Sequence, residues 1–237
     1  MTSSKLHARI YRALDDQQAL LHPARAGFRK QLLFLIAEAR AQWPFVDYGA
    51  GYLYQSFPRL GLRGFRSTDV RAAQMDIANA LVNRSVLEIG CNSGFLSMTL
   101  APGARRYVAF DNNPYLVDIA KLVQRELGDG QVDFSVDTIE AFASMQRFEV
   151  VLSFANHSTW DGNMTLALDA YFEKLRALLV EGGLLFFESH HPVLENDIQL
   201  RDTLKAMGRH FVIDAPRKLT EGSAWDRGRS FVRAVAR

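Results

Sequence analysis

The sequence predicts an α/β protein in which a mostly parallel β-sheet is covered by helices on both faces. Three observations indicate this fold class. From residue 85 onward, short apolar segments alternate with segments of helical periodicity. The apolar segments are continuous, which is typical of strands that are buried on both faces. A turn with two glycines follows the first of them and opens a helix, as in nucleotide-binding α/β sheets.

The length and composition are those of a globular protein with one sizeable core. The chain has 237 residues, of which 48% are hydrophobic and 23% charged, and this balance excludes collagen-like and disordered chains. No apolar run reaches the roughly 18 residues that a membrane helix needs, so we expect no membrane span. Charged residues interrupt the first segment, which is unlike a secretory signal. The single cysteine, Cys91, excludes an internal disulfide and agrees with a cytoplasmic location.

Residues 1–82 are predicted to form a helical extension and a lid loop. Residues 3–42 show helical spacing that is interrupted at Pro23, which predicts two helices. Residues 43–66 are rich in glycine and aromatic residues and have no regular period, which predicts a long ordered loop of the kind that often binds or covers a ligand. Ser67 is a suitable N-cap for a helix that we expect to continue to about Val82.

Residues 83–237 are predicted to form the sheet domain. Its strands are expected at SVLEIG, RYVAF, QVDFSV, FEVVLSF and GGLLFFES. The segments between them, at about 95–101, 114–127, 138–145 and 164–180, have helical spacing. After Glu188 a helix is expected near 197–207, followed by RHFVID and RSFVRAVAR. No helix separates these two strands, so they predict an antiparallel hairpin at one edge of the sheet.

The net charge of +2 conceals an uneven distribution. Residues 1–71 hold 11 basic and 5 acidic residues, residues 72–200 hold 8 and 17, and residues 201–237 hold 9 and 4. If the fold brings the two basic ends to one face, an anionic small-molecule substrate would be attracted there. The alternative is a surface of solvated arginines with no binding role.

The segment VLEIGCNSGF carries the most chemical information. Gly90 and Gly94 suit a turn in which the backbone bends tightly and a ligand approaches without meeting a Cβ. Glu88 places a carboxylate just before the turn, which suits a cationic or hydroxylated ligand better than a pyrophosphate. With Asn92 between the glycines, the spacing does not match the dinucleotide fingerprint G-x-G-x-x-G. No Lys-Ser/Thr pair follows, which excludes an ATPase-type phosphate loop.

VLEIGCNSGF resembles the first motif of the class I S-adenosylmethionine-dependent methyltransferases, in which an acidic residue precedes a Gly-x-Gly-x-Gly turn. Asn92 replaces the middle glycine. The resemblance covers about residues 83–237. It implies a Rossmann-like seven-stranded sheet in the order 3-2-1-4-5-7-6 with strand 7 antiparallel, S-adenosyl-L-methionine as the cofactor, and the N-terminal helices as a cap on the pocket.

Polar residues at the ends of the next two strands fit this resemblance. Asp111 follows Gly90 by 21 residues, where a carboxylate can accept hydrogen bonds from both hydroxyls of a ribose; the alternative is a helix N-cap. Members of the family hold the adenine after the third strand, here at residues 137–139. The predicted cofactor-binding residues are Glu88, Gly90, Asn92, Gly94, Asp111, Asn112, Asp137, Thr138, Ile139 and Arg66.

Histidines after the fourth and fifth strands are the candidate catalytic residues. In the family, the exit of strand 4 adjoins the transferable methyl group, and here it reads NHST, which differs from the Asn/Asp-Pro-Pro-aromatic signature of adenine and amide N-methyltransferases. His157, His190 or His191 could act as the general base that removes a hydroxyl proton. The alternative is a structural or substrate-orienting role. A metal site with Asp161 or Glu188 is disfavoured, because adjacent histidines rarely ligate one ion.

The lid loop and the residues after it carry arginines and tyrosines. Arginine forks suit carboxylates or phosphates, so they could hold the methionine carboxylate of the cofactor or an anionic substrate. The aromatic rings could cover the methyl donor and exclude water. The alternative is that they only pack the helices against the sheet. The residues concerned are Tyr52, Tyr54, Arg59, Arg63, Arg66 and Arg71.

The predicted function is that of an S-adenosylmethionine-dependent methyltransferase acting on a hydroxyl of a small-molecule or sugar-like acceptor. RNA methylation, with tRNA as an example, is one alternative, since both ends of the chain are basic. The near-neutral net charge and the lack of a recognisable RNA-binding module disfavour it. A non-catalytic binding module with the same fold is another alternative. The intact Glu88, Gly90, Gly94 and Asp111 argue against it.

Overall fold

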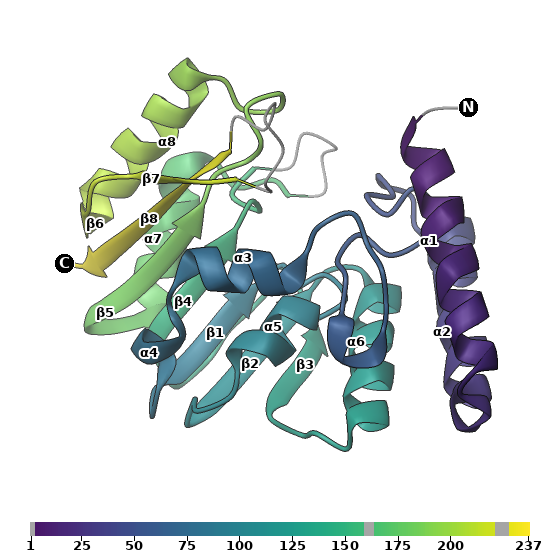
Figure 1. Cartoon of the computed structure of the whole chain (residues 1–237). Coiled ribbons are helices and arrows are strands. Elements are labelled where there is room, and N and C mark those ends of the chain that lie inside the picture. The colour runs from purple at the N-terminus through teal and green to yellow at the C-terminus, as the bar shows by residue number, and fades with distance from the viewer. Residues whose placement is uncertain (1–2, 159–163, 221–227) are drawn as a thin grey trace.

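A mixed eight-stranded β-sheet forms the centre of the computed structural model, which describes residues 3–158, 164–220 and 228–237 (Figure 1). The strands are β1 Ser85–Ile89, β2 Arg106–Asp111, β3 Val132–Val136, β4 Phe148–Phe154, β5 Leu179–Glu188, β6 Phe211–Ile213, β7 Arg217–Leu219 and β8 Arg229–Ala236. They follow the order β3-β2-β1-β4-β5-β8-β6, and β7 pairs with β8. With β8 counted as strand 7, the predicted order is confirmed. The short β7 is an eighth strand that the prediction of seven lacked.

Strand directions also agree with the prediction. The first five strands are mutually parallel, and β8 runs antiparallel to β5, β6 and β7. The helices are α1 Ser3–Leu20, α2 Ala26–Gln42, α3 Thr68–Met75, α4 Ala78–Leu81, α5 Phe95–Leu100, α6 Pro114–Leu127, α7 Leu168–Leu178 and α8 Asp197–His210. None of the helices described has the length and apolar character needed to cross a membrane.

Apolar side chains from successive strand residues form a core on each face of the sheet. Val86 and Val150 project into one core, which α3, α5 and α6 cover. Leu87 and Val151 project into the other, which α7 and α8 cover. This arrangement follows from the two-residue period of a strand, because a continuous apolar segment supplies side chains to both faces.

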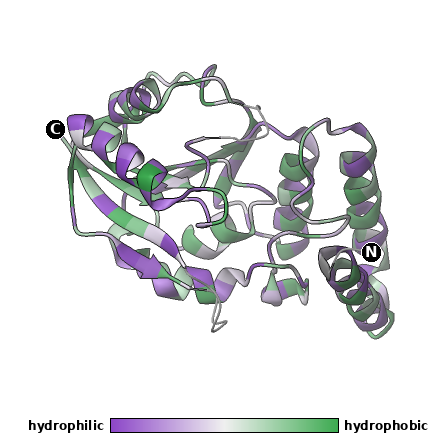
Figure 2. Cartoon of the chain, turned by 90° about the horizontal axis from the view of Figure 1, so that it is seen from above, coloured by the Kyte–Doolittle hydropathy of each residue, from purple (hydrophilic) through white to green (hydrophobic). Residues whose placement is uncertain are grey.

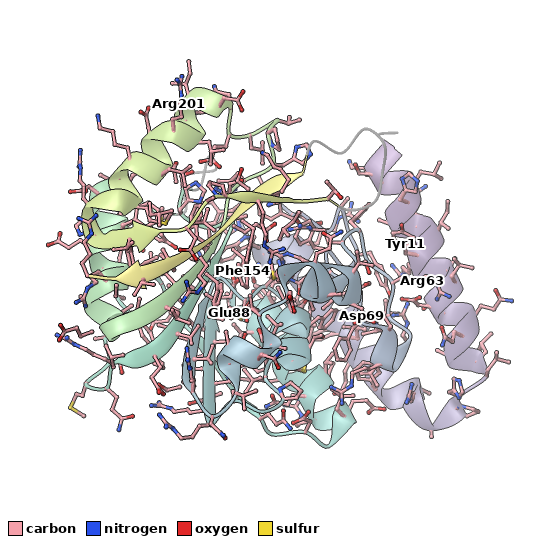
Figure 3. The ribbon with its side chains drawn as sticks, turned by 60° about the vertical axis from the view of Figure 1, so that its left-hand side comes forward. Tyr11, Arg63, Asp69, Glu88, Phe154 and Arg201 are labelled. Atoms are coloured by element: carbon pink, nitrogen blue, oxygen red, sulfur yellow. The ribbon has the colours of Figure 1, made fainter. Side chains whose placement is uncertain are left out.

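The two N-terminal helices are confirmed, with their boundary at the short 3-10 helix Pro23–Arg25. They lie side by side next to α6 and show alternating hydrophobic and hydrophilic stripes (Figures 1 and 2). Asp15 of α1 accepts hydrogen bonds from the Tyr52 hydroxyl at 2.6 Å and from the Arg63 guanidinium at 2.6 Å. Figure 3 shows Arg63 beside this helix. These bonds attach the lid loop, residues 43–66, to the helical pair.

Two predicted helices are wrong in detail. The helix expected to continue to about Val82 breaks at Asp76, which has a φ of +49° and ends α3; Asp tolerates this left-handed conformation better than most residues. Residues 138–145 form turns instead of a helix. There the Thr138 hydroxyl accepts the backbone N–H of Ala141 at 3.1 Å, a local bond that competes with helix formation.

The turn after β1 requires a glycine at its last position, just before α5. Gly94 has a φ of +71° and directly precedes α5. A Cβ at this position would lie 2.6 Å from the Phe134 ring and 2.7 Å from the Ala120 Cβ. The turn therefore packs against β3 and α6 at a distance that only glycine allows.

One buried carboxylate connects the lid loop and α3 to the sheet. Glu188, the last residue of β5, is 0% exposed. It accepts hydrogen bonds from Arg66 of the lid loop at 3.1 Å and from Arg71 of α3, and it lies 3.5 Å from the Arg229 guanidinium of β8. Burial by itself raises the pKa of Glu188, but the charges of Arg71, Arg66 and Arg229 more than offset this and lower it to about 2.

We expect Gly94→Ala to reduce the free energy of unfolding by about 2–5 kcal/mol, since it adds a steric clash to the cost of a positive φ. Gly128→Ala is the matched control, because Gly128 also has a positive φ, +65°, but its Cβ would meet nothing within 4 Å. The control should lose only about 1–2 kcal/mol. Urea denaturation measures both. Equal losses in the two variants would contradict the close packing of this turn.

Glu188→Gln is expected to cost about 3 kcal/mol of stability at pH 7, because it removes a buried charge whose pKa lies well below 4.5. A lowered folded-state pKa means that this contribution is complete above about pH 5 and declines as the pH falls toward 2. The difference between wild type and Glu188→Gln should therefore be nearly the same in urea titrations at pH 7 and pH 5 and smaller at pH 3.5. Glu181→Gln, at an exposed position of the same strand, should cost less than about 0.5 kcal/mol. A pH-independent difference would refute the assignment.

Candidate functional site

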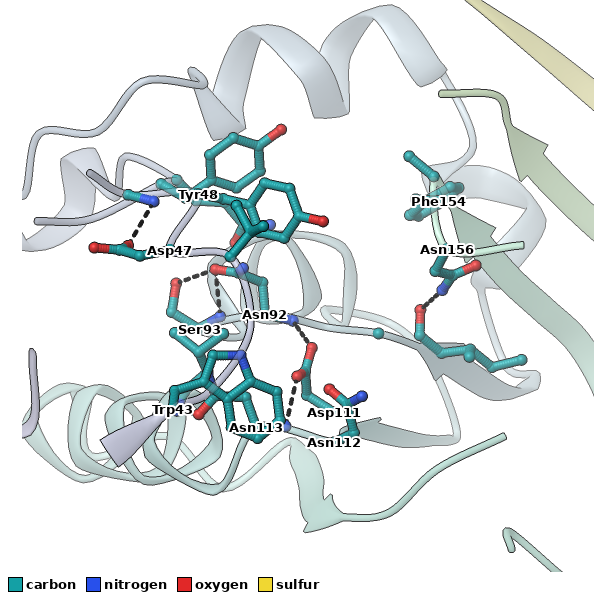
Figure 4. Close-up of a pocket in the computed structure, with 18 of the residues that line it drawn as sticks. Trp43, Asp47, Tyr48, Asn92, Ser93, Asp111, Asn112, Asn113, Phe154 and Asn156 are labelled. Atoms are coloured by element: carbon teal, nitrogen blue, oxygen red, sulfur yellow. Dashed lines mark hydrogen bonds between the residues drawn. The ribbon is translucent and has the colours of Figure 1, made fainter. Parts of the chain in front are cut away.

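A cavity of about 390 Å³ opens where the parallel strands end at their carboxyl termini (Figure 4). This volume lies in the range of about 300–1,000 Å³ that is typical of small-molecule sites. Its walls come from the turns after β1, β2, β3 and β4, the start of β8, the end of α2 and the lid loop. The position agrees with the general rule that open α/β sheets bind ligands at the carboxyl edge of their strands.

The turn after β1 forms part of the cavity wall through Glu88, Gly90 and Asn92. Gly90 has a φ of +66°, and a Cβ there would lie 2.8 Å from the Asn156 amide nitrogen, which itself donates to the Ile89 carbonyl. The Asn156 side chain therefore fills the space that a Cβ would take, and the backbone of Gly90 itself lines the cavity. Gly94 is not part of the wall, and its role in the structure is to let the turn pack.

The carboxylate of Glu88 lies in the wall and is almost completely buried. Figure 3 shows Glu88 and Phe154 near the middle of the molecule. Glu88 accepts a hydrogen bond from the Tyr107 hydroxyl at 2.6 Å. Burial raises the pKa of Glu88, and the Tyr107 hydrogen bond offsets only part of this effect. The side chain is therefore fixed in place beside the turn.

Asp111 connects the tip of β2 to the glycine turn. One carboxylate oxygen accepts the backbone N–H of Asn92 at 2.8 Å, and the other accepts that of Asn113 at 3.0 Å (Figure 4). Burial raises the pKa of Asp111, and these backbone hydrogen bonds oppose the shift. Asn113, not Asp111, is the N-cap of α6, since its side chain accepts from Tyr115 at 3.0 Å. The helix-cap alternative for Asp111 is therefore wrong for α6.

Residues after β2 and β3 extend the wall on the same side. Asn112, Asp137, Thr138 and Ile139 all line the cavity. The Asp137 backbone N–H donates to the Asp111 carbonyl at 3.1 Å, and its side chain accepts from the Thr138 N–H at 2.8 Å. The structure thus brings nine of the ten predicted cofactor-binding residues to one cavity, and Gly94 is the exception.

Aromatic residues of the lid loop cover the cavity. Trp43, Tyr48, Tyr52 and Tyr54 are in its wall, and Figure 4 shows Trp43 and Tyr48 on the side of Ser93 and Asn92. The Asp47 side chain stabilises the loop by accepting the backbone N–H groups of residues 49 and 51. Trp43 and Tyr48 were not among the predicted site residues, although the aromatic content of residues 43–66 was a signal for them.

The predicted lid arginines divide into two groups. Arg66 and Arg71 line the cavity and pair with Glu188. Arg59 and Arg63 do not line it: they lie 4.0 Å from Asp129 and 2.6 Å from Asp15, respectively, where they hold the loop in place. The structure adds Arg229 of β8, which also lines the cavity and donates to the Tyr54 hydroxyl at 3.3 Å. Its partners are far away in the sequence, and no motif marks it.

The three candidate histidines occupy different environments. His190 lines the cavity. His157 is 1% exposed and does not line it; its Nε2 lies 2.9 Å from Glu195, and its ring centre is 4.5 Å from that of His190. His191 points elsewhere, with Nδ1 accepting the Val193 N–H at 3.2 Å. Thr159, Trp160 and Asp161, which belong to the same predicted segment as His157, lie outside the described residues.

His190 is neutral at pH 7. Burial is the main cause that lowers the pKa of His190 to about 4, and the neighbouring His157 lowers it further. Its Nε2 lies 2.5 Å from the Ser158 carbonyl oxygen. Since a carbonyl only accepts, Nε2 carries the proton and Nδ1 keeps a lone pair. Nδ1 is therefore the ring nitrogen of His190 that can accept a hydrogen bond.

Glu195 supports both histidines and was missed by the sequence reasoning. Its carboxylate accepts hydrogen bonds from the His190 backbone N–H at 2.9 Å and from the Thr203 hydroxyl at 2.8 Å, and it is also hydrogen-bonded to the His157 ring. Burial raises the pKa of Glu195, but the hydrogen bond and the charge of His157 outweigh this, and the net shift is downward. Within the described ranges, no group of three or more His, Cys, Asp or Glu residues is arranged to hold a metal ion.

Comparison with known proteins identifies the domain. Residues 86–183 match the family described as "Methyltransferase domain". The chain is 27% identical over 126 residues to a ubiquinone biosynthesis O-methyltransferase of Chelativorans sp., covering 52% of this chain and 43% of that protein. It is 36% identical over 78 residues to the protein of that name from Xanthomonas oryzae pv. oryzae, covering 33% and 30%. The chain thus spans less than half the length of these curated relatives.

Solved structures share the fold at low sequence identity. The N-methyltransferase NodS from Bradyrhizobium japonicum superposes with a TM-score of 0.58 at 19% identity, over 70% of this chain and 94% of that one. A Listeria monocytogenes protein with a provisional description as an S-adenosylmethionine-dependent methyltransferase superposes with a TM-score of 0.58 at 15% identity. The superposition covers 72% of this chain and 98% of that one. The chain therefore contains a methyltransferase domain and has the fold of the class I S-adenosylmethionine-dependent methyltransferases.

Proposed function

We propose that this protein binds S-adenosylmethionine in the cavity and transfers its methyl group to a hydroxyl of a small molecule. The observation that carries the proposal is the position of Asp111, whose carboxylate lines the cavity beside the main chain of Gly90. A nucleoside that bears an amino acid fits such a site, because its ribose hydroxyls can donate to the carboxylate while its chain lies against the glycine turn. The match of residues 86–183 to a methyltransferase domain supports the proposal.

The residues present suit this cofactor in charge as well as in shape. Asp111, Asp137 and Glu88 give the side of the cavity at β1, β2 and β3 a negative character, which is favourable for a ligand with hydroxyl, ammonium and sulfonium groups. Ile139 supplies an apolar surface for a base. When bound, S-adenosylmethionine supplies an electrophilic methyl group that an oxygen nucleophile can attack.

The hydroxyl acceptor is proposed from two observations. The curated relatives are O-methyltransferases by name, and the exit of β4 lacks the signature of base or amide N-methylation. His190, with a free lone pair on Nδ1, can accept the hydrogen bond of an acceptor hydroxyl and receive its proton. Because a general base works best when its pKa is near the working pH, the low pKa of His190 limits the benefit of proton transfer.

Catalysis in this site would therefore rest mainly on positioning. The lid loop and the wall formed by Phe154 and Asn156 hold both reactants and exclude water, and aligning two reactants is worth more than a weak base. Trp43, Tyr48 and Tyr54 reduce the access of solvent to the methyl donor.

Asp111→Asn should weaken binding of S-adenosylhomocysteine by about tenfold or more, because it removes a charged acceptor of ribose hydrogen bonds. Isothermal titration calorimetry measures the affinity, and thermal unfolding checks that the variant folds. Asp133→Asn, on the exposed side of β3, is the control and should change the affinity less than about twofold. Absence of binding by folded wild type, or equal binding by Asp111→Asn, would refute the proposed cofactor site.

His190→Ala should lower kcat by about 10²-fold, the lower end of the range for general-base removal, with little change in affinity for S-adenosylhomocysteine. The assay is turnover of S-adenosylmethionine with a panel of hydroxylated small molecules. His191→Ala should keep activity near that of wild type, since His191 does not line the cavity. Full activity in His190→Ala, or a loss confined to His191→Ala, would contradict the assignment of His190.

A further inference from the structure

Most charged residues that line the cavity are segregated by sign, although Arg40 at the end of α2 belongs to neither group. The acidic residues Glu88, Asp111 and Asp137 lie on or after β1, β2 and β3, while the cations Arg66, Arg71 and Arg229 surround Glu188 at the end of β5 and the start of β8. The strand order β3-β2-β1-β4-β5-β8 separates the two groups. We call them the acidic half and the basic half of the cavity.

The two halves meet at β4, where the Arg71 guanidinium lies 5.3 Å from the centre of the Phe154 ring. Arg229 is farther from the acidic half, because three strand spacings separate β1 from β8, which amounts to about 14 Å at about 4.8 Å per spacing. The proposed cofactor site occupies the acidic half, where Asp111 and the Gly90 turn lie. The basic half adjoins it on the other side of β4, next to His190, the proposed contact of the acceptor. A molecule that receives the methyl group would therefore lie against the basic half.

The cations of the basic half exceed the charge of the carboxylate that they contact. Among the described residues, Arg71 and Arg229 are two cations that pair with a single carboxylate, that of Glu188. Both side chains are largely buried, at 8% and 13% exposure. The neighbouring carboxylate, Glu88, is hydrogen-bonded to Tyr107, and the charge of Arg71 opposes the rise of its pKa. Positive charge at a cavity wall attracts an anion.

We propose that the basic half binds a carboxylate of the methyl acceptor, so that the substrate is a hydroxylated organic acid. A planar guanidinium presents paired donors that match a carboxylate. Arg229 is the principal contact: it is anchored by Tyr54 and by Glu188, which fix its direction. This inference rests on the proposed function, since it assumes that the acidic half holds the methyl donor.

The test compares hydroxy acids with their neutral amides on protein saturated with S-adenosylhomocysteine. The probes are 4-hydroxybenzoate, 4-hydroxyphenylacetate and lactate, each beside its amide, and the measurement is isothermal titration calorimetry. We expect at least one acid to bind wild type about tenfold or more tightly than its amide, which is the range for a hydrogen-bonded charge pair. The preference should fall below about twofold in Arg229→Gln and persist in part in Arg229→Lys, which keeps the charge.

Arg233→Gln is the matched control. Arg233 lies on the same strand, but it pairs with Asp214 at the surface at 2.8 Å, away from the cavity. This variant should keep the full preference for the acid. The proposal is overturned if no acid exceeds its amide in wild type, if Arg229→Gln retains the preference, or if phenyl phosphate binds more tightly than every carboxylate.

A second comparison separates the acceptor from the donor. If Arg229 holds the carboxylate of the donor instead, Arg229→Gln will lose affinity for S-adenosylhomocysteine but not for 5′-methylthioadenosine, which lacks the amino-acid group; this result also overturns the inference. We expect Arg229→Gln to bind both nucleosides as wild type does. If wild type binds no S-adenosylhomocysteine, the proposed function fails, while titration of the same acids and amides into the unliganded protein still tests the anion site.

Discussion

The shape of the cavity depends on the buried charge of Glu188. A carboxylate without solvent is stable only when cations and hydrogen bonds compensate it, and here the compensation comes from the lid loop, α3 and β8. One side chain at the end of β5 therefore contacts three segments that are distant from one another in the sequence. The same contacts bring Arg66, Arg71 and Arg229 to the cavity wall, so the interaction that closes the fold also sets the charge of the site.

The two sides of the cavity differ in charge as a result of this constraint. The glycine turn and Asp111 form a rigid acidic side, held by hydrogen bonds between the carboxylate and the backbone. The opposite side is cationic, and aromatic rings of the lid loop line the cavity as well. A site with this polarity can align a positively charged donor with an anionic acceptor, and in methyl transfer such alignment can supply most of the rate enhancement.

The histidine network shows how environment separates chemically identical side chains. His157, His190 and His191 were equivalent candidates in the sequence. Their burial and hydrogen bonds give them distinct environments. Glu195 is hydrogen-bonded to the ring of His157 and accepts the backbone N–H of His190. Of the three histidines, only His190 lines the cavity. Its proton is fixed on Nε2 by the Ser158 carbonyl, so the network determines which nitrogen can act.

The sequence by itself determined the features that depend on local pattern: the parallel strands, their order through the resemblance, the glycine turn, and the carboxylate at the tip of β2. The break at Asp76, the turns at 138–145 and strand β7 were decided by the tertiary structure, since backbone conformation there depends on single side-chain bonds and on packing. Arg229, Glu195 and the choice of His190 also required the fold. The role of each residue depends on a contact with another element, and such tertiary contacts leave no periodic signal in the sequence.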